Sequence, residues 1–282
     1  MSKRINIFGS KPKWEPEVVK LLGVTLSVAK DNTLYMPSTA YEIAGIDLWN
    51  YYNTLIENTK DIFGLQRKVM SLNQRMKFWY PRLLDSATAH KYNAVDPTTF
   101  VGTYNGGFTH DGSGDDPNGS NAYFDTDCVF NTFSQNDMSF FVLIKENNNG
   151  TYADYGCVAG GAGELLLYPR IASTNLRSRL SSSADVTDTH SSSLGFIGHT
   201  RNSSTEFKTF VDGSVLETNT DTSFAPNGLK IKEYATSLSN DSTHIFYTPN
   251  RHTHFMGLDG VTDTEAQDIY NAIANLETAL NR

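Results

Sequence analysis

The chain has 282 residues, of which 39% are hydrophobic and 12% are aromatic, enough to bury a sizeable core in one large domain or two unequal ones. This composition excludes a chain that is disordered over most of its length. The net charge of -8 argues against a protein whose main work is binding nucleic acid, because such binding depends on clustered Lys and Arg.

The sequence shows no signal for membrane insertion or secretion. Apolar runs such as residues 140–144 have the length of strands, whereas a membrane-spanning helix needs roughly 20 apolar residues. Lys3 and Arg4 are not followed by the apolar segment that a signal peptide contains. Cys128 and Cys157 are too few for a disulfide scaffold. We expect two reduced, buried thiols, with one disulfide between neighbouring strands as the alternative.

Residues 1–38 form the first segment of the chain. Residues 11–16 (KPKWEP) predict an extended, turn-prone stretch, since each proline restricts its own backbone and that of the residue before it. Residues 21–28 are compatible with a short strand or a short helix. Two interpretations of the segment stay open: an N-terminal arm that becomes ordered against a partner, or an ordinary loop.

A long helical pattern follows over residues 39–80. It begins with a T-x-x-E capping box at residues 39–42, in which two side chains satisfy free N–H groups at a helix start. Asn58 is the one strongly polar position of the stripe and can set the register of paired helices, and Pro81 ends the pattern. The stripe alternates at spacings of four and three, which is typical of a coiled-coil seam, through Ala44, Leu48, Tyr51, Leu55, Asn58, Ile62, Leu65, Val69, Leu72, Met76 and Trp79.

Two arrangements of this helical region stay open. In the first, helices from several chains form a parallel stalk. Large residues of mixed type at both seam positions do not strongly favour a dimer, and a homotrimer is the preferred state. In the second, Gly64 marks a bend and extra apolar residues such as Ile43 and Phe63 widen the buried face, so that a two-helix hairpin packs on the chain's own sandwich. The stalk arrangement assigns the oligomerisation contacts to Leu48, Leu55, Asn58, Ile62, Leu65, Val69, Leu72 and Met76.

Composition changes near residue 85, after which Gly, Ser, Thr and Asn are abundant and short apolar runs recur. Dipeptides that favour tight turns lie at residues 118–119, 212–213 and 227–228. Eight or more short strands with such turns are typical of a sandwich or jelly roll. The apolar runs predict strands over residues 122–125, 138–145, 152–158, 164–171, 193–201, 206–212, 229–235, 243–247 and 254–258.

The last predicted element is a helix close to the C-terminus. Thr262 and Glu265 repeat the capping-box pattern at its start. We expect its apolar face to pack against the sandwich or the stalk, because a stripe of this width must be buried. The residues of that face are Ala266, Ile269, Ile273, Leu276 and Leu280.

Several segments resemble a known group of proteins. Residues 76–93 read MKFWYPRLLDSATAHKYN, and residues 104–126 continue as YNGGFTHDGSGDDPNGSNAYFDT. This order of motifs resembles a recurrent segment of phage virion proteins that precedes a concanavalin A-like, or laminin-G-like, sandwich. Residues 194–217 are similar to the laminin-G hairpin, a strand that ends in Arg, a polar turn, and a strand that closes on Asp-Gly. Residues 257–282 are similar to the helical tail of such phage domains.

The resemblance implies a virion surface protein, commonly a head or tail fibre, that is made in the cytoplasm of a host bacterium. Together with the patterns above, it predicts a mainly β fold: a concanavalin A-like β-sandwich (jelly roll) with an α-helical N-terminal region and a C-terminal helix. Residues 1–38 would be an arm and a possible anchor to other virion proteins. Residues 39–80 would be the stalk or hairpin, and residues 81–282 the lectin-like sandwich.

The sequence carries no recognisable catalytic motif. Glucanases with this type of fold carry alternating acidic residues on one strand, so that two carboxylates flank the glycosidic bond, but the chain has no E-x-D-x-E pattern, and Glu164, Glu206 and Glu217 stand apart. No nucleophile elbow or phosphate-binding loop is found. We therefore predict that the chain is not an enzyme and needs no cofactor.

Two groups of residues are candidate metal ligands. Asp111, Ser113 and Asp115 fit the first positions of a calcium loop, but Asp116 stands where Gly is needed, so a solvated turn in a Gly-rich loop is favoured. His252 and His254 alternate on a predicted strand, which would place both imidazoles on one face. In a threefold assembly they could meet their copies and bind a metal, although ordinary partly buried histidines are favoured. His90, His110, His190, His199 and His244 show no ligand spacing.

Three functions are compatible with these features. The favoured one is a homotrimeric virion fibre or surface decoration, whose lectin-like domains attach to a host-surface glycan by avidity. The second is an architectural capsid or tail component that binds no sugar. A glycan depolymerase is the least supported of the three. Binding to nucleic acid and insertion into a membrane are not expected, and the sequence does not identify the residues that would bind carbohydrate.

Overall fold

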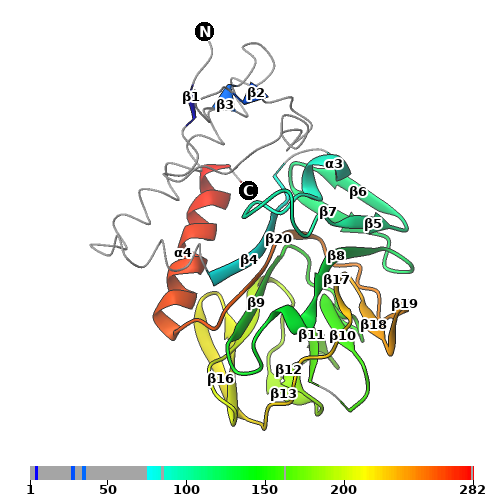
Figure 1. Cartoon of the computed structure of the whole chain (residues 1–282), viewed down its shortest axis with the longest axis vertical. Helices are drawn as coiled ribbons and strands as arrows, with labels where there is room; N and C mark the ends of the chain where they lie inside the picture. The colour runs from blue at the N-terminus through cyan, green and yellow to red at the C-terminus, as the bar shows by residue number, and fades with distance from the viewer. Residues whose placement is uncertain are drawn as a thin grey trace.

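The structure, a computed structural model, describes residues 4–5, 27–28, 34–35, 75–83, 86–161, 163–280 and 282. Its main part is a sandwich of two mainly antiparallel sheets, with one long helix, α4 (Asp263–Ala279), on the outside (Figure 1). Among the described residues, no helix has the length and apolar character that crossing a membrane requires. Three short strands pair in the order β1-β3-β2, namely β1 (Arg4–Ile5), β2 (Ser27–Val28) and β3 (Leu34–Tyr35).

The first sheet of the sandwich has the order β13-β12-β11-β10-β17-β8-β5, and β18 adds to it by pairing in parallel with β10 and antiparallel with β19. Its strands are β5 (Thr103–Asn105), β8 (Tyr123–Val129), β10 (Tyr155–Val158), β11 (Glu164–Ile171), β12 (Asn175–Ser182), β13 (Val186–Thr189), β17 (Lys230–Glu233), β18 (Thr236–Leu238) and β19 (Asn240–Ile245).

The second sheet has the order β16-β15-β14-β9-β20-β7-β6, and β4 also pairs with β20. Its strands are β4 (Met76–Pro81), β6 (Phe108–Asp111), β7 (Gly114–Pro117), β9 (Met138–Ile144), β14 (Gly195–Arg201), β15 (Glu206–Val211), β16 (Ser214–Thr220) and β20 (His252–Leu258). A single turn of helix, α3 (Ala87–His90), follows β4, and the 3-10 turn η2 (Phe130–Thr132) follows β8.

The alternation of side chains along β9 explains why the sandwich has two apolar layers. Phe140 and Val142 point between the two sheets, whereas Phe141 and Leu143 point to the side that α4 covers. All seven residues of β9 are therefore buried, as expected for a strand covered on both faces. Cys128 and Cys157 lie in the core between the sheets, free of any disulfide. The expectation of two reduced, buried thiols is thus confirmed.

Helix α4 begins and packs as its sequence predicts. The Thr262 side chain accepts a hydrogen bond from the Glu265 backbone, and the Glu265 carboxylate accepts one from the Thr262 backbone. This reciprocal capping satisfies two backbone donors at the helix start. The predicted face packs on the outer side of the second sheet (Figure 1), where its members join a layer with Trp79 and Phe141, and these members are Ala266, Ile269, Ile273 and Leu276.

Each of the nine strands predicted from the sequence overlaps a strand of the sandwich. Two of the missed strands are mainly polar: β12 alternates buried with partly exposed residues, and β16 is mostly exposed. Such strands are held by backbone pairing, which leaves little apolar signal. The hairpin inferred from the laminin-G resemblance is confirmed, since β14 ends at Arg201 and Asp212 and Gly213 adopt positive φ of 49° and 76° in the turn between β15 and β16.

The prediction that the helical region extends to residue 80 is wrong. Met76 and Trp79, assigned to the last turns of a helix over residues 39–80, lie on β4 and pair with Leu258 and Met256 of β20. Successive side chains of the segment MKFWYP point to opposite faces, as in a strand. The segment contains only two positions of the helical stripe, so their agreement with the helical spacing arose by chance. The sandwich therefore includes residues before 81. The remaining oligomerisation residues, Leu48, Leu55, Asn58, Ile62, Leu65, Val69 and Leu72, lie outside the described residues.

Candidate functional site

The acidic segment at residues 111–116 is a β-hairpin and not the solvated loop that the sequence favoured. Asp111 ends β6, where its carboxylate accepts a hydrogen bond from the Ser113 backbone at 2.8 Å. Gly114 begins β7 with φ of +122°, and a Cβ there would lie 2.4 Å from the His252 carbonyl oxygen. Only glycine permits this approach to β20. The close approach brings Asp115, the next residue, into the interior, where it is fully buried.

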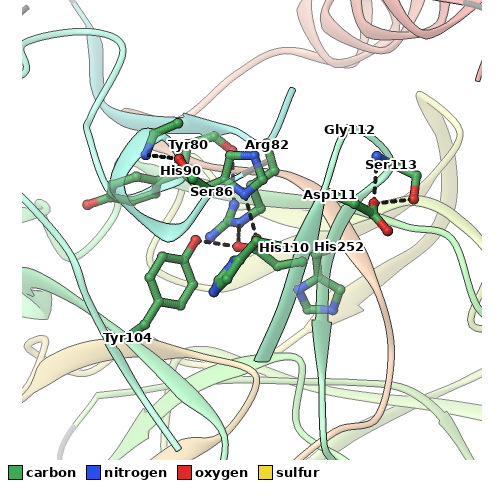
Figure 2. A network of polar contacts seen from close by, with 12 residues as sticks. Tyr80, Arg82, Ser86, His90, Tyr104, His110, Asp111, Gly112, Ser113 and His252 are labelled. Atoms are coloured by element: carbon green, nitrogen blue, oxygen red, sulfur yellow. Dashed lines mark hydrogen bonds and ion pairs between the residues drawn. The ribbon is translucent and has the colours of Figure 1, made fainter. Parts of the chain in front are cut away.

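The Asp115 carboxylate is the centre of a buried set of polar contacts. Figure 2 shows its partners Arg82, His90, Tyr104 and His110. One oxygen lies 2.6 Å from the Nδ1 atoms of both His90 and His110. The other accepts a hydrogen bond from Arg82 Nε at 2.6 Å and one from the Tyr104 hydroxyl. Both carboxylate oxygens thus have partners, as a buried charge requires.

Arg82 joins this carboxylate to a second one. It follows β4, where its backbone N–H donates to the Thr253 carbonyl at 2.8 Å. Its side chain is fully buried and also pairs with Glu233 and donates to the Tyr80 carbonyl at 2.9 Å. The guanidinium lies 5.2 Å from the Phe124 ring centroid, within the range of a cation–π contact. Arg82 is therefore held from several sides in one geometry.

His252 extends the contacts to a third carboxylate. Its ring nitrogens lie 3.0 Å from Glu233 and 2.5 Å from Asp154, and its ring stacks on Tyr234 at 4.2 Å. Asn250 donates to Asp154 at 3.0 Å. We refer to this connected set as the Arg82 network, and its members are Arg82, His90, Tyr104, His110, Asp115, Asp154, Glu233 and His252.

Proton affinities in the Arg82 network follow from these contacts. Burial alone would raise the pKa of Asp115, but the hydrogen bonds from His110 and His90 and the charge of Arg82 hold that pKa well below its ordinary value. Burial alone would lower the pKa of His252, but its bonds to Asp154 and Glu233 raise it above its ordinary value. The contacts of the network therefore favour the ionised form of Asp115 and the protonated form of His252.

The predicted metal candidates His252 and His254 do not share a face. The register between β20 and β9 shifts between them, which marks a β-bulge at Thr253. As a result, His252 points between the sheets, whereas His254 stacks on Trp79 and bonds with Glu277 of α4 at 2.9 Å. Both histidines are fully buried, so they cannot meet copies of themselves on a threefold axis. For His90 and His110 the sequence showed no ligand spacing, but the fold brings the two side chains together.

The carboxylates of the Arg82 network are not arranged for glycoside hydrolysis. That reaction needs two carboxyl groups that reach the two sides of a bound sugar, whereas Asp115 and Glu233 are fully buried and paired with Arg82. Among the glutamates that stand apart in the sequence, Glu164 is buried and pairs with Arg179, and Glu206 is exposed on β15. Within the described residues, the fold thus brings no predicted acid into a catalytic pair.

An aromatic surface lies on the outer side of the first sheet, formed by Tyr123, His244 and Tyr247. The rings of Tyr123 and His244 stack at 3.9 Å. Partial burial, the Asp125 carboxylate and Tyr247 raise the pKa of Tyr123. Asp125 is next to Tyr123 on the outward face of β8 and accepts from Lys232 Nζ at 2.7 Å. The outward alternation of Tyr123 and Asp125 is the one sequence signal that could have indicated this surface.

Comparison with solved structures finds similar folds in other proteins. One similar structure is that of botulinum neurotoxin type C, whose cell entry depends on interaction with two ganglioside molecules. The match covers 73% of this chain and 53% of the toxin chain, with a TM-score of 0.52 and 9% sequence identity. The binding domain of botulinum neurotoxin serotype D matches 72% at a TM-score of 0.46 and 12% identity, over 52% of its chain. The chain therefore spans about half the length of these toxin chains.

A third match is domain 4 of AbnA, a GH43 extracellular arabinanase from Geobacillus stearothermophilus, in complex with arabinotriose. It matches 70% of this chain and 98% of its own, with 13% identity and a TM-score of 0.45. No protein-family model and no curated protein matches the sequence. At these identities the type C toxin match establishes the fold alone, and it confirms the predicted β-sandwich.

Proposed function

We propose that the chain is a non-catalytic surface protein of a phage particle, a head or tail fibre or decoration whose sandwich binds a host-surface glycan. The phage assignment rests on the resemblance of residues 76–93 and 104–126 to virion proteins. The non-catalytic role is supported by the Arg82 network, whose acidic groups are fully buried. The lectin-like sandwich supplies a scaffold on which a sugar-binding surface can be displayed.

The observation that carries the glycan proposal is the aromatic surface. Tyr123 and His244 stack on each other and are both partly exposed, and aromatic rings combine apolar contact area with hydrogen bonding. The Asp125 carboxylate beside them can accept charge-assisted hydrogen bonds from sugar hydroxyl groups. A sandwich of similar fold belongs to a toxin that interacts with gangliosides. Each single site would be weak, and a multivalent particle would raise the effective affinity.

Replacing Tyr123 with Ala should lower the affinity for the bound glycan about twofold to 13-fold, because an aromatic contact contributes about 0.5–1.5 kcal/mol. A glycan array first identifies the sugar, and titration of that sugar compares the variants. Phe224→Ala is the matched control, since Phe224 is 42% exposed and lies outside the aromatic surface. Failure of the assembled protein to bind any glycan or host cell would favour an architectural role, and release of reducing ends would indicate a depolymerase.

The proposal includes a homotrimer formed by the helical pattern of residues 39–74. Replacing Leu55 and Ile62 together with Asp should dissociate the assembly to single chains, since two charges would enter the apolar seam of every helix. Light scattering should then give one third of the trimer mass, with the sandwich still folded by circular dichroism. Asn53→Asp with Lys60→Asp, off the seam, is the control. An unchanged mass for the seam variant would support the two-helix hairpin.

A further inference from the structure

Three side chains with metal-binding groups converge from three elements at one end of the sandwich. His90 ends α3, His110 lies on β6, and Asp115 lies on β7. One potential ligand atom of each lies within 4.8 Å of the other two. Figure 2 shows His90 and His110 directed to the same region as Arg82 and Tyr104. The elements are held there by backbone pairing of β6, β7 and β20.

We propose that His90, His110 and Asp115 form a binding site for a divalent transition-metal ion of the Zn²⁺ type. Two imidazole nitrogens and one carboxylate oxygen are ligands that Zn²⁺ binds at roughly 2.0–2.2 Å. Three protein ligands leave a fourth position for water. The histidines make Ca²⁺ and Mg²⁺ poor candidates, because both ions prefer oxygen ligands. This inference is independent of the proposed glycan binding.

The oxygen of Asp115 that would bind the metal is oriented by contacts to the other oxygen. Arg82 Nε donates to Asp115 Oδ2 at 2.6 Å, and the Tyr104 hydroxyl donates to the same atom. Asp115 Oδ1 faces the two imidazoles, and the Nδ1 atom of each imidazole lies 2.6 Å from it. Partners of this kind around a ligand fix its geometry and raise metal affinity. A bound metal would take the place of the contacts between the two imidazoles and Oδ1.

Burial and charge both suit a cation at this position. His90 and Asp115 have no exposed side-chain area, whereas the His110 side chain keeps 15%. The site is thus enclosed, with His110 on the side from which an ion and a water ligand can arrive. The surrounding network contains three buried carboxylates, of Asp115, Glu233 and Asp154, which outnumber its permanent cation Arg82. A bound divalent ion would offset this excess and tie α3 to the β6–β7 hairpin.

The test uses the untagged full chain, stripped with a chelator and titrated with ZnCl₂ by calorimetry. We expect one equivalent of Zn²⁺ to bind, and His110→Ala to lower the affinity by more than ~100-fold, while Tyr104→Phe lowers it ~10-fold through the lost support of Asp115. His190→Ala is the control and should bind like the original chain. Titration with CaCl₂ should give no binding.

Co²⁺ provides a measurement that does not depend on any variant folding. The unmodified chain with one equivalent of Co²⁺ should show the intense visible absorption of a four-coordinate ion with nitrogen and oxygen ligands. Absence of both Zn²⁺ and Co²⁺ binding would overturn the proposal and leave a purely hydrogen-bonded cluster. Binding that is unchanged in a folded His110→Ala chain, or a Co²⁺ spectrum of the hydrated ion, would overturn it as well.

Discussion

Replacing Arg82 with Met should lower the free energy of unfolding by about 3–5 kcal/mol, the effect expected when one partner of a buried ion pair is removed. Arg82 is fully buried and pairs with both Asp115 and Glu233. Without it, two carboxylates would remain in the interior with no permanent cation beside them, and desolvation of each would oppose folding. Urea unfolding followed by tryptophan fluorescence measures the change.

Two further variants make this result specific. Arg251→Met removes a partly exposed arginine that lies 3.1 Å from Asp111 and from Asp116, and it should lower the unfolding free energy by less than about 1 kcal/mol. Arg82→Met with Glu233→Gln removes one of the two orphaned charges, so it should be more stable than Arg82→Met alone. If Arg82→Met were no less stable than Arg251→Met, the Arg82 network would not hold the sandwich together.

Replacing His199 with Leu should make the protein less sensitive to acid. His199 on β14 is fully buried, and its Nδ1 has no hydrogen-bond partner among the described residues. Burial, together with the charge of Arg201, lowers the pKa of His199 to about 3. The unfolded chain, with an ordinary pKa near 6.5, takes up this proton first as the pH falls, so acid favours unfolding.

The size of this effect follows from the linkage between proton binding and stability. Each pH unit between about 6.5 and about 3 should lower the unfolding free energy by about 1.4 kcal/mol through this residue. Between about pH 6.5 and pH 4.5 the original chain should therefore lose about 2–3 kcal/mol more than His199→Leu. Urea unfolding at both pH values measures the difference.

Tyr155→Phe is the matched control for the acid experiment. It removes the hydroxyl that lies 3.3 Å from His199 Nε2 but leaves the buried imidazole in place. We expect it to keep the pH dependence of the original chain. Parallel pH dependence in the original chain and in His199→Leu would show that His199 does not titrate on unfolding in this range.

Local patterns in the sequence were sufficient for much of the sandwich. The apolar run of β9 predicted a strand because seven consecutive buried residues exceed what one exposed face allows. Thr262 and Glu265 predicted the start of α4 because capping involves residues only three apart. Asp212 and Gly213 predicted a hairpin because their backbone tolerates positive φ. Each of these signals acts between near neighbours in the chain, so it is visible without the fold.

The candidate sites depended on contacts that no local spacing encodes. Arg82 meets Glu233 across 151 residues, and the pairing of β4 and β7 along the same edge of β20 brings Arg82 to Asp115. The bulge at Thr253 sends His252 and His254 to opposite faces, although simple alternation placed them together. By itself the sequence determined a β-sandwich closed by a capped helix. Only the tertiary structure decided which charged residues are buried together, because sheet pairing joins strands that are distant in the chain.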